Sequence, residues 1–207
     1  MAVGASLDAA RWSALCERLG LPPSPDTFAR LQTLHSERHR HYHTAAHVNA
    51  MLGHLDRLRS HAKRPDLIEL AIWFHDAVYK PMSQTNERDS ADMAVAFLSG
   101  HLPPDDVETV ETMIVLTQTH GDTTDPDTAL MLDIDLSILA APPEVYQRYT
   151  EAIRREYRLV PGPLYRRGRA KVLRHFLDMP RIYKTDAVAE AWEAAARGNL
   201  MTELESM

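Results

Sequence analysis

One short stretch of the chain is rich in histidine. Of the 11 histidines, five lie within thirteen residues, at positions His35, His39, His41, His43 and His47. The segment RHYHTAAHV leads into a run whose apolar residues have helical spacing and include Met51. His47 stands four residues before Met51 and is therefore predicted on the core-facing side, with His43 one turn further back. An inward imidazole is either a core histidine with satisfied hydrogen bonds or a metal ligand.

A second candidate is the dipeptide His75-Asp76. It follows a segment, residues 67–74, that is apolar nearly all round and is predicted as a buried helix. An ionised aspartate is costly to bury unless it is paired or coordinates a cation. Adjacent side chains on a helix diverge by about 100°, but an imidazole and a carboxylate differ enough in length to reach one ion. The pair is thus a candidate for two ligands of the same metal.

Two further carboxylates lie in a third apolar helix, predicted over residues 132–139. Asp133 and Asp135 are two residues apart, so their side chains diverge by about 200° and at most one of them faces a given site. Asp135 shares a face with Met131. Asp133 could cap a helix, pair with an arginine, or orient a ligand histidine through a hydrogen bond to the ring nitrogen that does not bind the metal.

Together these residues form a mixed nitrogen and oxygen ligand set. It contains two neutral imidazoles, His47 and His75, with Asp76 and one of the two later aspartates, whose charges balance a divalent cation. Such a set suits Mn, Fe, Co, Ni or Zn better than Ca, and Mg is included among the ions expected, in one or two copies. Four protein ligands on an octahedral ion leave positions for water and a phosphate oxygen, as a catalytic site requires. The common nucleotide-binding and nucleophile motifs, GxxxxGKS/T, GxGxxG, GxSxG and HExxH, are absent.

Helices must position all of these residues. Thirteen prolines separate segments whose apolar residues recur with helical spacing, and no segment alternates with period two. Ser6 and Gly20 are typical of the cap and the terminator of a first helix, and Pro65-Asp66 of the start of another. We expect one all-α domain over residues 1–207, a bundle of about eight to ten helices. The apolar stripe of its last helix is predicted to include Val188, Ala191, Trp192 and Ala195.

The composition excludes several classes of protein. With 207 residues, 44% of them hydrophobic, the chain can bury a core and is not disordered. A net charge of −6 argues against general nucleic-acid binding. Cys16 is the single cysteine, which rules out an internal disulfide or a cysteine-rich metal site. Residues 1–10 carry no signal-peptide pattern, and the most apolar run, 67–74, is far shorter than the roughly 20 residues of a membrane span, so a cytoplasmic protein is expected.

The order His47, His75-Asp76, Asp135 resembles the H…HD…D pattern of the HD superfamily of metal-dependent phosphohydrolases, which are all-α. The chain looks most like a small bacterial family of predicted HD phosphohydrolases. The resemblance implies an HD-type fold, a bound metal and a hydrolase activity. The similar blocks cover most of the chain: RHYHTAAHV (40–48), AIWFHDAVY (71–79), NERDSA (86–91), LDIDLSIL (132–139), and YRRGRAKVLRHFL with RIY (165–183).

Two blocks also resemble the cyclic-nucleotide phosphodiesterases. In that family's YHNxxHA motif, a proton-donating histidine precedes the metal-binding histidine by one turn, and the last aspartate ligand stands in an ADLS-like context. YHTAAHV and DLS match these positions, with Thr44 where the motif has asparagine. The resemblance implies that His43 is the general acid and that Asp135, rather than Asp133, is the fourth ligand.

Three other residues are candidates on less specific grounds. Glu87 could orient the attacking water or serve a second ion, although Asn86 is also typical of a helix cap with Glu87 in the first turn. His120 is predicted at a helix end, where it contacts either the helix dipole or the site. A basic segment, residues 151–174, has eight basic and two acidic side chains, and Arg169 within it is the predicted phosphate contact. The alternative for any one of these arginines is a solvated helix face.

The sequence thus predicts a metal-dependent phosphohydrolase. Metal-bound hydroxide would attack a phosphomonoester or phosphodiester of a small molecule, with a nucleotide as the favoured substrate, and His43 would protonate the leaving oxygen. Two alternatives remain open: a non-catalytic HD module that senses a nucleotide, and a di-iron HD oxygenase, which would need further histidine ligands such as His120. The expected partner is the small phosphorylated substrate, not a membrane or nucleic acid in general, and a homodimer is an option.

Overall fold

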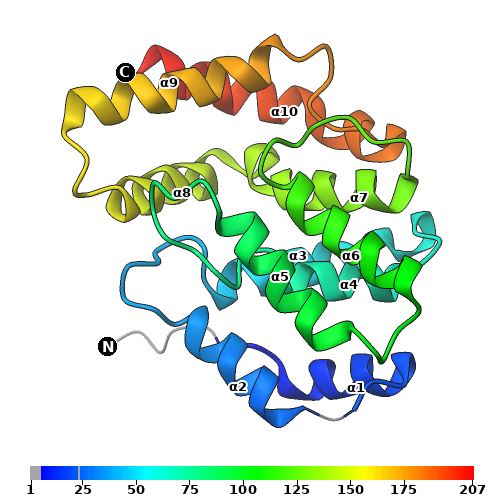
Figure 1. Cartoon of the computed structure of the whole chain (residues 1–207). Helices are drawn as coiled ribbons and strands as arrows, with labels where there is room; N and C mark the ends of the chain where they lie inside the picture. The colour runs from blue at the N-terminus through cyan, green and yellow to red at the C-terminus, as the bar shows by residue number, and fades with distance from the viewer. Residues whose placement is uncertain (1–5, 23) are drawn as a thin grey trace. The chain divides into compact units, whose positions relative to one another are not determined.

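The computed structural model describes residues 6–22 and 24–207, and it is all-helical (Figure 1). Among these residues there are ten α-helices and two short 3₁₀ helices, and no strand beyond an isolated bridge between Ser99 and Leu102. The prediction of an all-α protein with about eight to ten helices is confirmed. The elements are α1 (Ala9–Leu19), α2 (Pro25–Leu34), α3 (Ala45–Leu58), η1 (Arg59–His61), α4 (Pro65–Phe74), α5 (Asn86–Leu98), α6 (Pro104–Leu116), α7 (Pro126–Asp135), η2 (Leu136–Ala140), α8 (Pro143–Glu156), α9 (Gly162–Asp178) and α10 (Asp186–Glu205).

The chain divides into two compact units. The first extends to Leu132 and the second runs from Asp133 to Met207, so the division falls inside α7. A single domain over residues 1–207 stays a prediction. Within the part of the chain that the structure describes, no helix is both long and apolar enough to cross a membrane.

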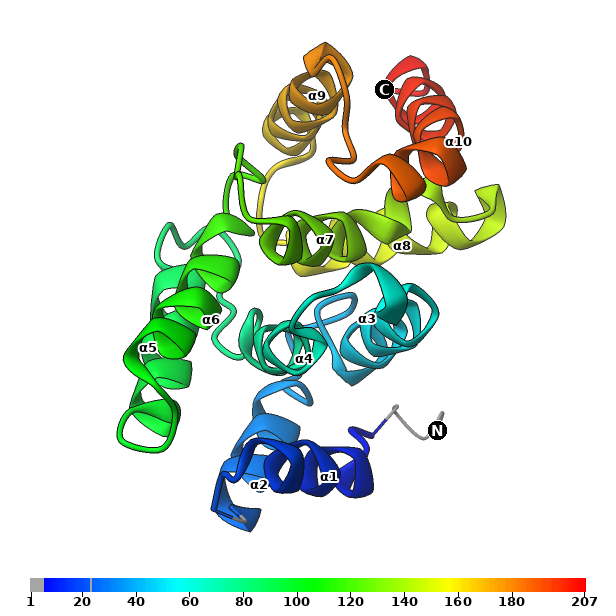
Figure 2. The same cartoon turned by 90° about the vertical axis from the view of Figure 1, so that its right-hand side faces the viewer.

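Helix α4 forms the centre of the first unit. Every residue from Leu67 to Phe74 is buried, as expected for a helix that is apolar nearly all round. The helix contacts α1, α3, α5 and α6, and Figure 2 shows α3 and α4 side by side. Its one buried carboxylate, Glu69, pairs with Arg11 at 2.8 Å and with Arg18 at 3.1 Å. A buried charge is therefore compensated, and the helix that leads into His75-Asp76 is rigidly packed.

A buried aspartate holds the first turn of α4. Asp127 accepts hydrogen bonds from the backbone N–H groups of Lys63 and Arg64, at 2.8 and 2.7 Å. These N–H groups at a helix start have no partner inside the helix, so a distant carboxylate takes the place of a local cap. The predicted start of this helix at Pro65 is confirmed.

The predicted cap of the first helix is wrong, whereas its predicted terminator is confirmed. Helix α1 begins after Asp8, whose side chain accepts from the N–H of Arg11, so the capping residue is Asp8 and not Ser6. The helix ends at Gly20, which adopts a left-handed conformation with φ of 64°. Serine and aspartate both cap helices, and the two stand in close succession in this sequence.

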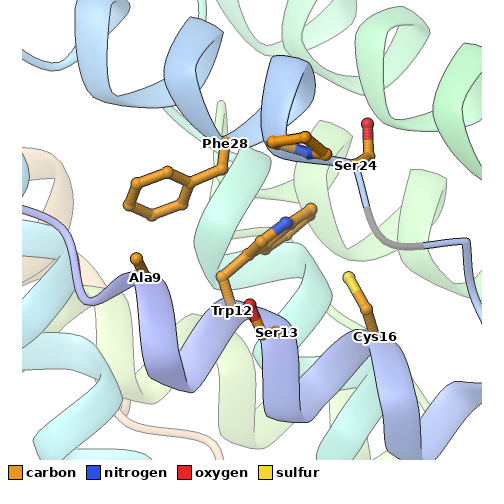
Figure 3. A pocket seen from close by; sticks show the side chains of 7 residues that line it. Ala9, Trp12, Ser13, Cys16, Ser24 and Phe28 are labelled. Carbon is orange, nitrogen blue, oxygen red and sulfur yellow. The ribbon is translucent and has the colours of Figure 1, made fainter.

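A small cavity lies between α1 and α2 in the first unit (Figure 3). Its volume is about 290 Å³, and Trp12, Cys16 and Phe28 are among the side chains that line it. Burial raises the pKa of the Cys16 thiol, so this cysteine stays protonated and unreactive. None of the residues lining the cavity is a predicted site residue.

The second unit is built around α10, which contacts α9 and η2. Tyr183 before this helix is buried and donates from its hydroxyl to the carbonyl of Leu136, at 3.0 Å. The predicted apolar stripe of α10 is only partly correct. Val188 is buried, but Ala191 and Ala195 are exposed, and the buried face continues instead through Ala196 and Leu200. Alanine gives little indication of which helix face is buried, because its methyl group is tolerated on either.

Candidate metal centre

Three predicted ligands converge in the first unit. The Nε2 atoms of His47 and His75 lie 3.3 Å apart, and Oδ2 of Asp76 lies 3.1 Å from Nε2 of His75 and 3.8 Å from Nε2 of His47. The side chains of the two histidines are almost fully buried, and that of Asp76 is 16% exposed. The three atoms therefore form a small triangle with limited access to solvent.

Helix ends bring the three residues together. His47 lies in the first turn of α3, which Thr44 caps by accepting from the N–H of Ala46. His75 is the C-cap residue that directly follows the last residue of α4, Phe74, and Asp76 comes next in the turn. Because α3 and α4 pack against each other, the beginning of one helix meets the end of the other.

The hydrogen bond of His75 fixes which of its ring nitrogens faces the site. Nδ1 lies 2.9 Å from the carbonyl oxygen of Ile72, and a carbonyl oxygen can only accept. The proton of a neutral His75 is thus on Nδ1, which leaves the lone pair of Nε2 directed at His47 and Asp76. A backbone carbonyl behind the ring is the usual way in which proteins orient a histidine that binds metal.

The three donor atoms fit a transition-metal ion. Ligands about 2.1 Å from an ion lie about 3.0 Å apart at a right angle and about 3.4 Å apart at the tetrahedral angle. The observed separations of 3.1 and 3.3 Å lie within that range, and the third, 3.8 Å, lies slightly above it. Two imidazoles with one carboxylate are a donor set for divalent transition metals.

Asp76 is held in its ionised form. Burial acts to raise the pKa of its carboxyl, but the positive charges that His75, His43 and His47 carry when protonated outweigh burial and lower the pKa well below the usual value of 3.8. A carboxylate that stays charged at neutral pH is the form that binds a cation.

His43 lies beside the three ligands but outside the helix. Helix α3 begins at Ala45, so the expectation that His43 occupies the preceding turn of the same helix is wrong. Its ring stacks on Tyr79 at 4.1 Å between centroids and lies 6.2 Å from the ring of His47. Thr44 caps the N-terminus of α3, so His43 lies before the helix. Stacking on Tyr79 fixes the orientation of the His43 ring.

Sequence reasoning missed Arg40. Its side chain has no exposed surface and donates to the backbone carbonyls of His43, Asp76 and Ala77, at 3.1, 2.6 and 2.9 Å. Its guanidinium also lies 5.5 Å from the ring centre of Tyr79. Arg40 stands three residues before His43 in the RHYH motif, and this proximity was the one signal that could have drawn attention to it.

The rest of the histidine cluster does not supply metal ligands. His39 donates from Nε2 to the carbonyl of Tyr79 at 2.8 Å, and His41 is exposed. His35 is 2% exposed, and neither of its ring nitrogens has a hydrogen-bond partner among the described residues. Burial, together with the charge of Arg40, lowers the pKa of His35 to about 3, so it is neutral.

The two aspartates of α7 have different surroundings. Asp133 is buried and accepts from the N–H groups of Lys184 and Thr185 and from the Thr185 hydroxyl, at 2.6, 2.8 and 2.7 Å. It therefore caps the start of α10, and of the three roles expected for it, capping is the one found. Asp135 is the last residue of α7, is half-buried and belongs to the second unit, so its role as the fourth ligand stays a prediction.

Glu87 lies where a helix-dipole contact is favourable. It is in the first turn of α5, which begins after Thr85. The predicted cap by Asn86 is wrong, because its amide is engaged with the backbone N–H and carbonyl of Lys80, both at 3.0 Å. The site role of Glu87 stays a prediction.

His120 follows α6 in a left-handed turn. Its φ is 49°, and its backbone N–H donates to the carbonyl of Leu116 at 2.8 Å, which closes the end of the helix. The prediction that His120 ends a helix is wrong by four residues, because α6 ends at Leu116, and a contact with substrate or metal stays a prediction.

The structure does not support Arg169 as the phosphate contact. Its guanidinium is buried in the second unit and makes two hydrogen bonds to Glu203, at 2.8 and 2.9 Å, and one to the Tyr149 hydroxyl at 3.2 Å. A bidentate, buried pair of this kind is structural, and a phosphate would have to displace the carboxylate. Six other cations of the 151–174 segment are exposed: Arg155, Arg158, Arg166, Arg167, Lys171 and Arg174.

In comparisons with known proteins, no family model, no curated protein and no solved structure matches this chain.

Proposed function

We propose that the protein is a metal-dependent phosphohydrolase that cleaves a phosphoester of a small molecule, with a nucleotide as the favoured substrate. The observation that carries the proposal is the convergence of Nε2 of His47, Nε2 of His75 and Oδ2 of Asp76 within 3.8 Å of one another. The sequence order of these residues, which resembles that of the HD superfamily, supports the same function.

His47, His75 and Asp76 would hold a divalent ion, and we propose Asp135 as the fourth ligand. Two carboxylates and two neutral imidazoles balance the charge of the ion. When bound, such an ion supplies an activated water and neutralises the charge of the phosphoryl group. Since the four ligands leave positions open, the site is suited to catalysis rather than to a purely structural metal.

His43 would donate the proton that the leaving oxygen needs. Its ring centre lies 6.2 Å from that of His47, so the proposed acid stands beside one of the proposed metal ligands. The stack on Tyr79 restricts the orientation of the ring, so the proton is held at one place. General acid catalysis of this kind contributes about 10² to 10⁴ in rate.

The test is elemental analysis of the purified protein, followed by phosphatase and phosphodiesterase assays with Mn²⁺, Co²⁺, Ni²⁺, Mg²⁺ and Zn²⁺. We expect one or two bound ions per chain and turnover that requires one of these metals. His43→Gln should lower the turnover number while metal content is retained. A protein with no bound metal would contradict the proposal. Metal with nucleotide binding but no turnover would favour a sensing module, and dioxygen consumption with iron would favour an oxygenase.

A further inference from the structure

Arg40 contacts both segments that form the candidate metal centre. One nitrogen of its guanidinium, Nη1, donates to the carbonyl of Asp76 at 2.6 Å and to the carbonyl of His43 at 3.1 Å. The other terminal nitrogen, Nη2, donates to the carbonyl of Ala77 at 2.9 Å. A single group therefore joins the backbone of a metal-ligand candidate to the backbone of the proposed general acid.

The carbonyls of His43 and Asp76 lie outside the helices that flank the candidate site. His43 stands two residues before the first residue of α3, and Asp76 two residues after the last residue of α4, so both lie outside these helices. Such carbonyl groups are outside the hydrogen-bond pattern of the helix, so a donor from elsewhere in the chain can fix them. Arg40 supplies that donor from a fully buried position.

We propose that Arg40 is the positioning residue of this site: it sets the placement of Asp76 relative to His43 and so determines the affinity for the metal. This inference rests on the proposed function, because it takes Asp76 as a ligand and His43 as the acid. The inference goes beyond the proposed function, because it assigns the geometry of the site to a residue that would touch neither the metal nor the substrate. Residues that orient metal ligands in other proteins change metal affinity by about 10- to 100-fold when they are removed.

Arg197 in the second unit provides a matched control. It donates from Nη1 to the carbonyl of Leu177 at 2.9 Å and from Nη2 to the carbonyl of Met179 at 2.7 Å. Its Nε pairs with Glu193 at 2.7 Å, just as Nε of Arg40 pairs with a glutamate. Both arginines thus bond backbone carbonyls at or beyond the end of a helix. They differ in that the carbonyls bonded by Arg197 belong to no predicted site residue.

Whether the removal of Arg40 weakens or strengthens metal binding distinguishes a positioning role from a purely electrostatic one. A buried cation that is bonded to the carbonyl of a ligand residue repels a divalent ion nearby. If Arg40 acted through its charge alone, its removal would strengthen metal binding. If Arg40 positions Asp76, its removal weakens metal binding despite the lost repulsion.

The experiment is a titration of the full chain with Co²⁺, which reports both affinity and, through its visible absorption, the coordination geometry. We expect Arg40→Met to weaken Co²⁺ binding by about tenfold or more and to alter the spectrum of the bound ion. Arg40→Lys should restore most of the affinity, because one ammonium can replace the two hydrogen bonds that Nη1 makes. Arg197→Met should lower the melting temperature without changing the Co²⁺ affinity or spectrum. If Arg40→Met does not fold, Arg40→Gln takes its place with the same expected weakening.

Two results would overturn the inference while leaving the proposed function intact. One is an Arg40→Met protein that binds Co²⁺ as tightly as the wild type or more tightly. The other is an Arg197→Met protein in which binding is weakened as much, since the effect would then follow from lost stability alone. A wild-type protein that binds no Co²⁺ would instead overturn the metal centre itself, and the role of Arg40 with it.

Discussion

Nε2 of His75 lies 3.1 Å from Oδ2 of Asp76, and both atoms are hydrogen-bond acceptors when the histidine is neutral. The ring proton is on Nδ1, which donates to the carbonyl of Ile72 at 2.9 Å. Two acceptors at this separation repel each other unless a cation, either a proton or a metal ion, lies between them. Since Nε2 of His47 is a third atom at 3.3 Å from the first, an ion satisfies the whole arrangement better than one proton does.

Replacing His75 should remove metal binding. In His75→Ala, the ion loses one of its proposed ligands, so we expect no stoichiometric metal and no turnover, with helicity retained. A ligand present at about 100 times its dissociation constant stabilises the folded state by about 2.7 kcal/mol. Calorimetric melting with and without Mn²⁺ should show this stabilisation in the wild type and in His41→Ala, in which an exposed histidine is replaced. Metal stoichiometry that is unchanged in His75→Ala would disprove the ligand assignment.

His35 should make the protein sensitive to acid. Its pKa falls from the usual 6.5 to about 3 because the ring is buried and lies near Arg40. Between these two pH values the unfolded chain binds a proton that the folded chain does not. The free energy of unfolding therefore decreases as the pH falls, by about 1.4 kcal/mol per pH unit for this one group.

Urea unfolding across that pH range tests the role of His35. In His35→Phe the group cannot be protonated, so we expect the free energy of unfolding to depend less steeply on pH than in the wild type. His41→Phe makes the same change at an exposed position and should retain the wild-type dependence. Equal slopes in all three proteins would show that His35 does not contribute.

The parts of the site that could be predicted are those encoded by local patterns. Residues 67–74 are apolar on nearly every side, so burial of the following His75-Asp76 pair could be inferred from the amino-acid sequence alone. The spacing from His47 to Met51 likewise indicated the inward direction of the imidazole, because both lie in α3. Such inferences need only the periodicity of one helix.

The parts that could not be predicted depend on contacts with distant backbone. Arg40 and Asp127 hold the two ends of α4 through carbonyl and N–H groups, and nearly every residue has these groups, so no side-chain pattern marks the partner. Arg169 stands in a basic run that looks solvated, and its pairing with Glu203 becomes visible only once α9 and α10 are packed. Long-range pairing of charges is not encoded by local spacing.

The ion pair of Arg169 should contribute to stability and not to substrate binding. Both side chains are at most 10% exposed, so Arg169→Met leaves the Glu203 carboxylate buried without its partner. Breaking a buried pair in this way costs about 3–5 kcal/mol of unfolding free energy. Arg169→Met combined with Glu203→Leu should be more stable than Arg169→Met alone, because no uncompensated charge remains.

Chemical denaturation measures these differences in the free energy of unfolding. Arg174→Met is the control at an exposed position, and its free energy of unfolding should change by no more than about 0.5 kcal/mol. The KM for a phosphoester substrate should be unaffected in Arg169→Met at temperatures where the protein is folded. A selective rise in KM with unchanged stability would restore Arg169 as a phosphate contact.

Substitution of Asp133 should lower stability, whereas substitution of Asp135 should weaken metal binding. In Asp133→Asn, the amide NH₂ faces the N–H groups of Lys184 and Thr185, so the cap of α10 is weakened, at a cost of about 1–2 kcal/mol. Metal content should be retained in that variant.

In Asp135→Asn, the proposed fourth ligand loses its charge, and we expect weaker metal binding with little change in the stability of the metal-free protein. Denaturation of the metal-free proteins and Co²⁺ titration together measure both quantities, each variant serving as the control for the other. The reverse outcome, with metal lost in Asp133→Asn and retained in Asp135→Asn, would contradict the assignment that the DLS resemblance implies.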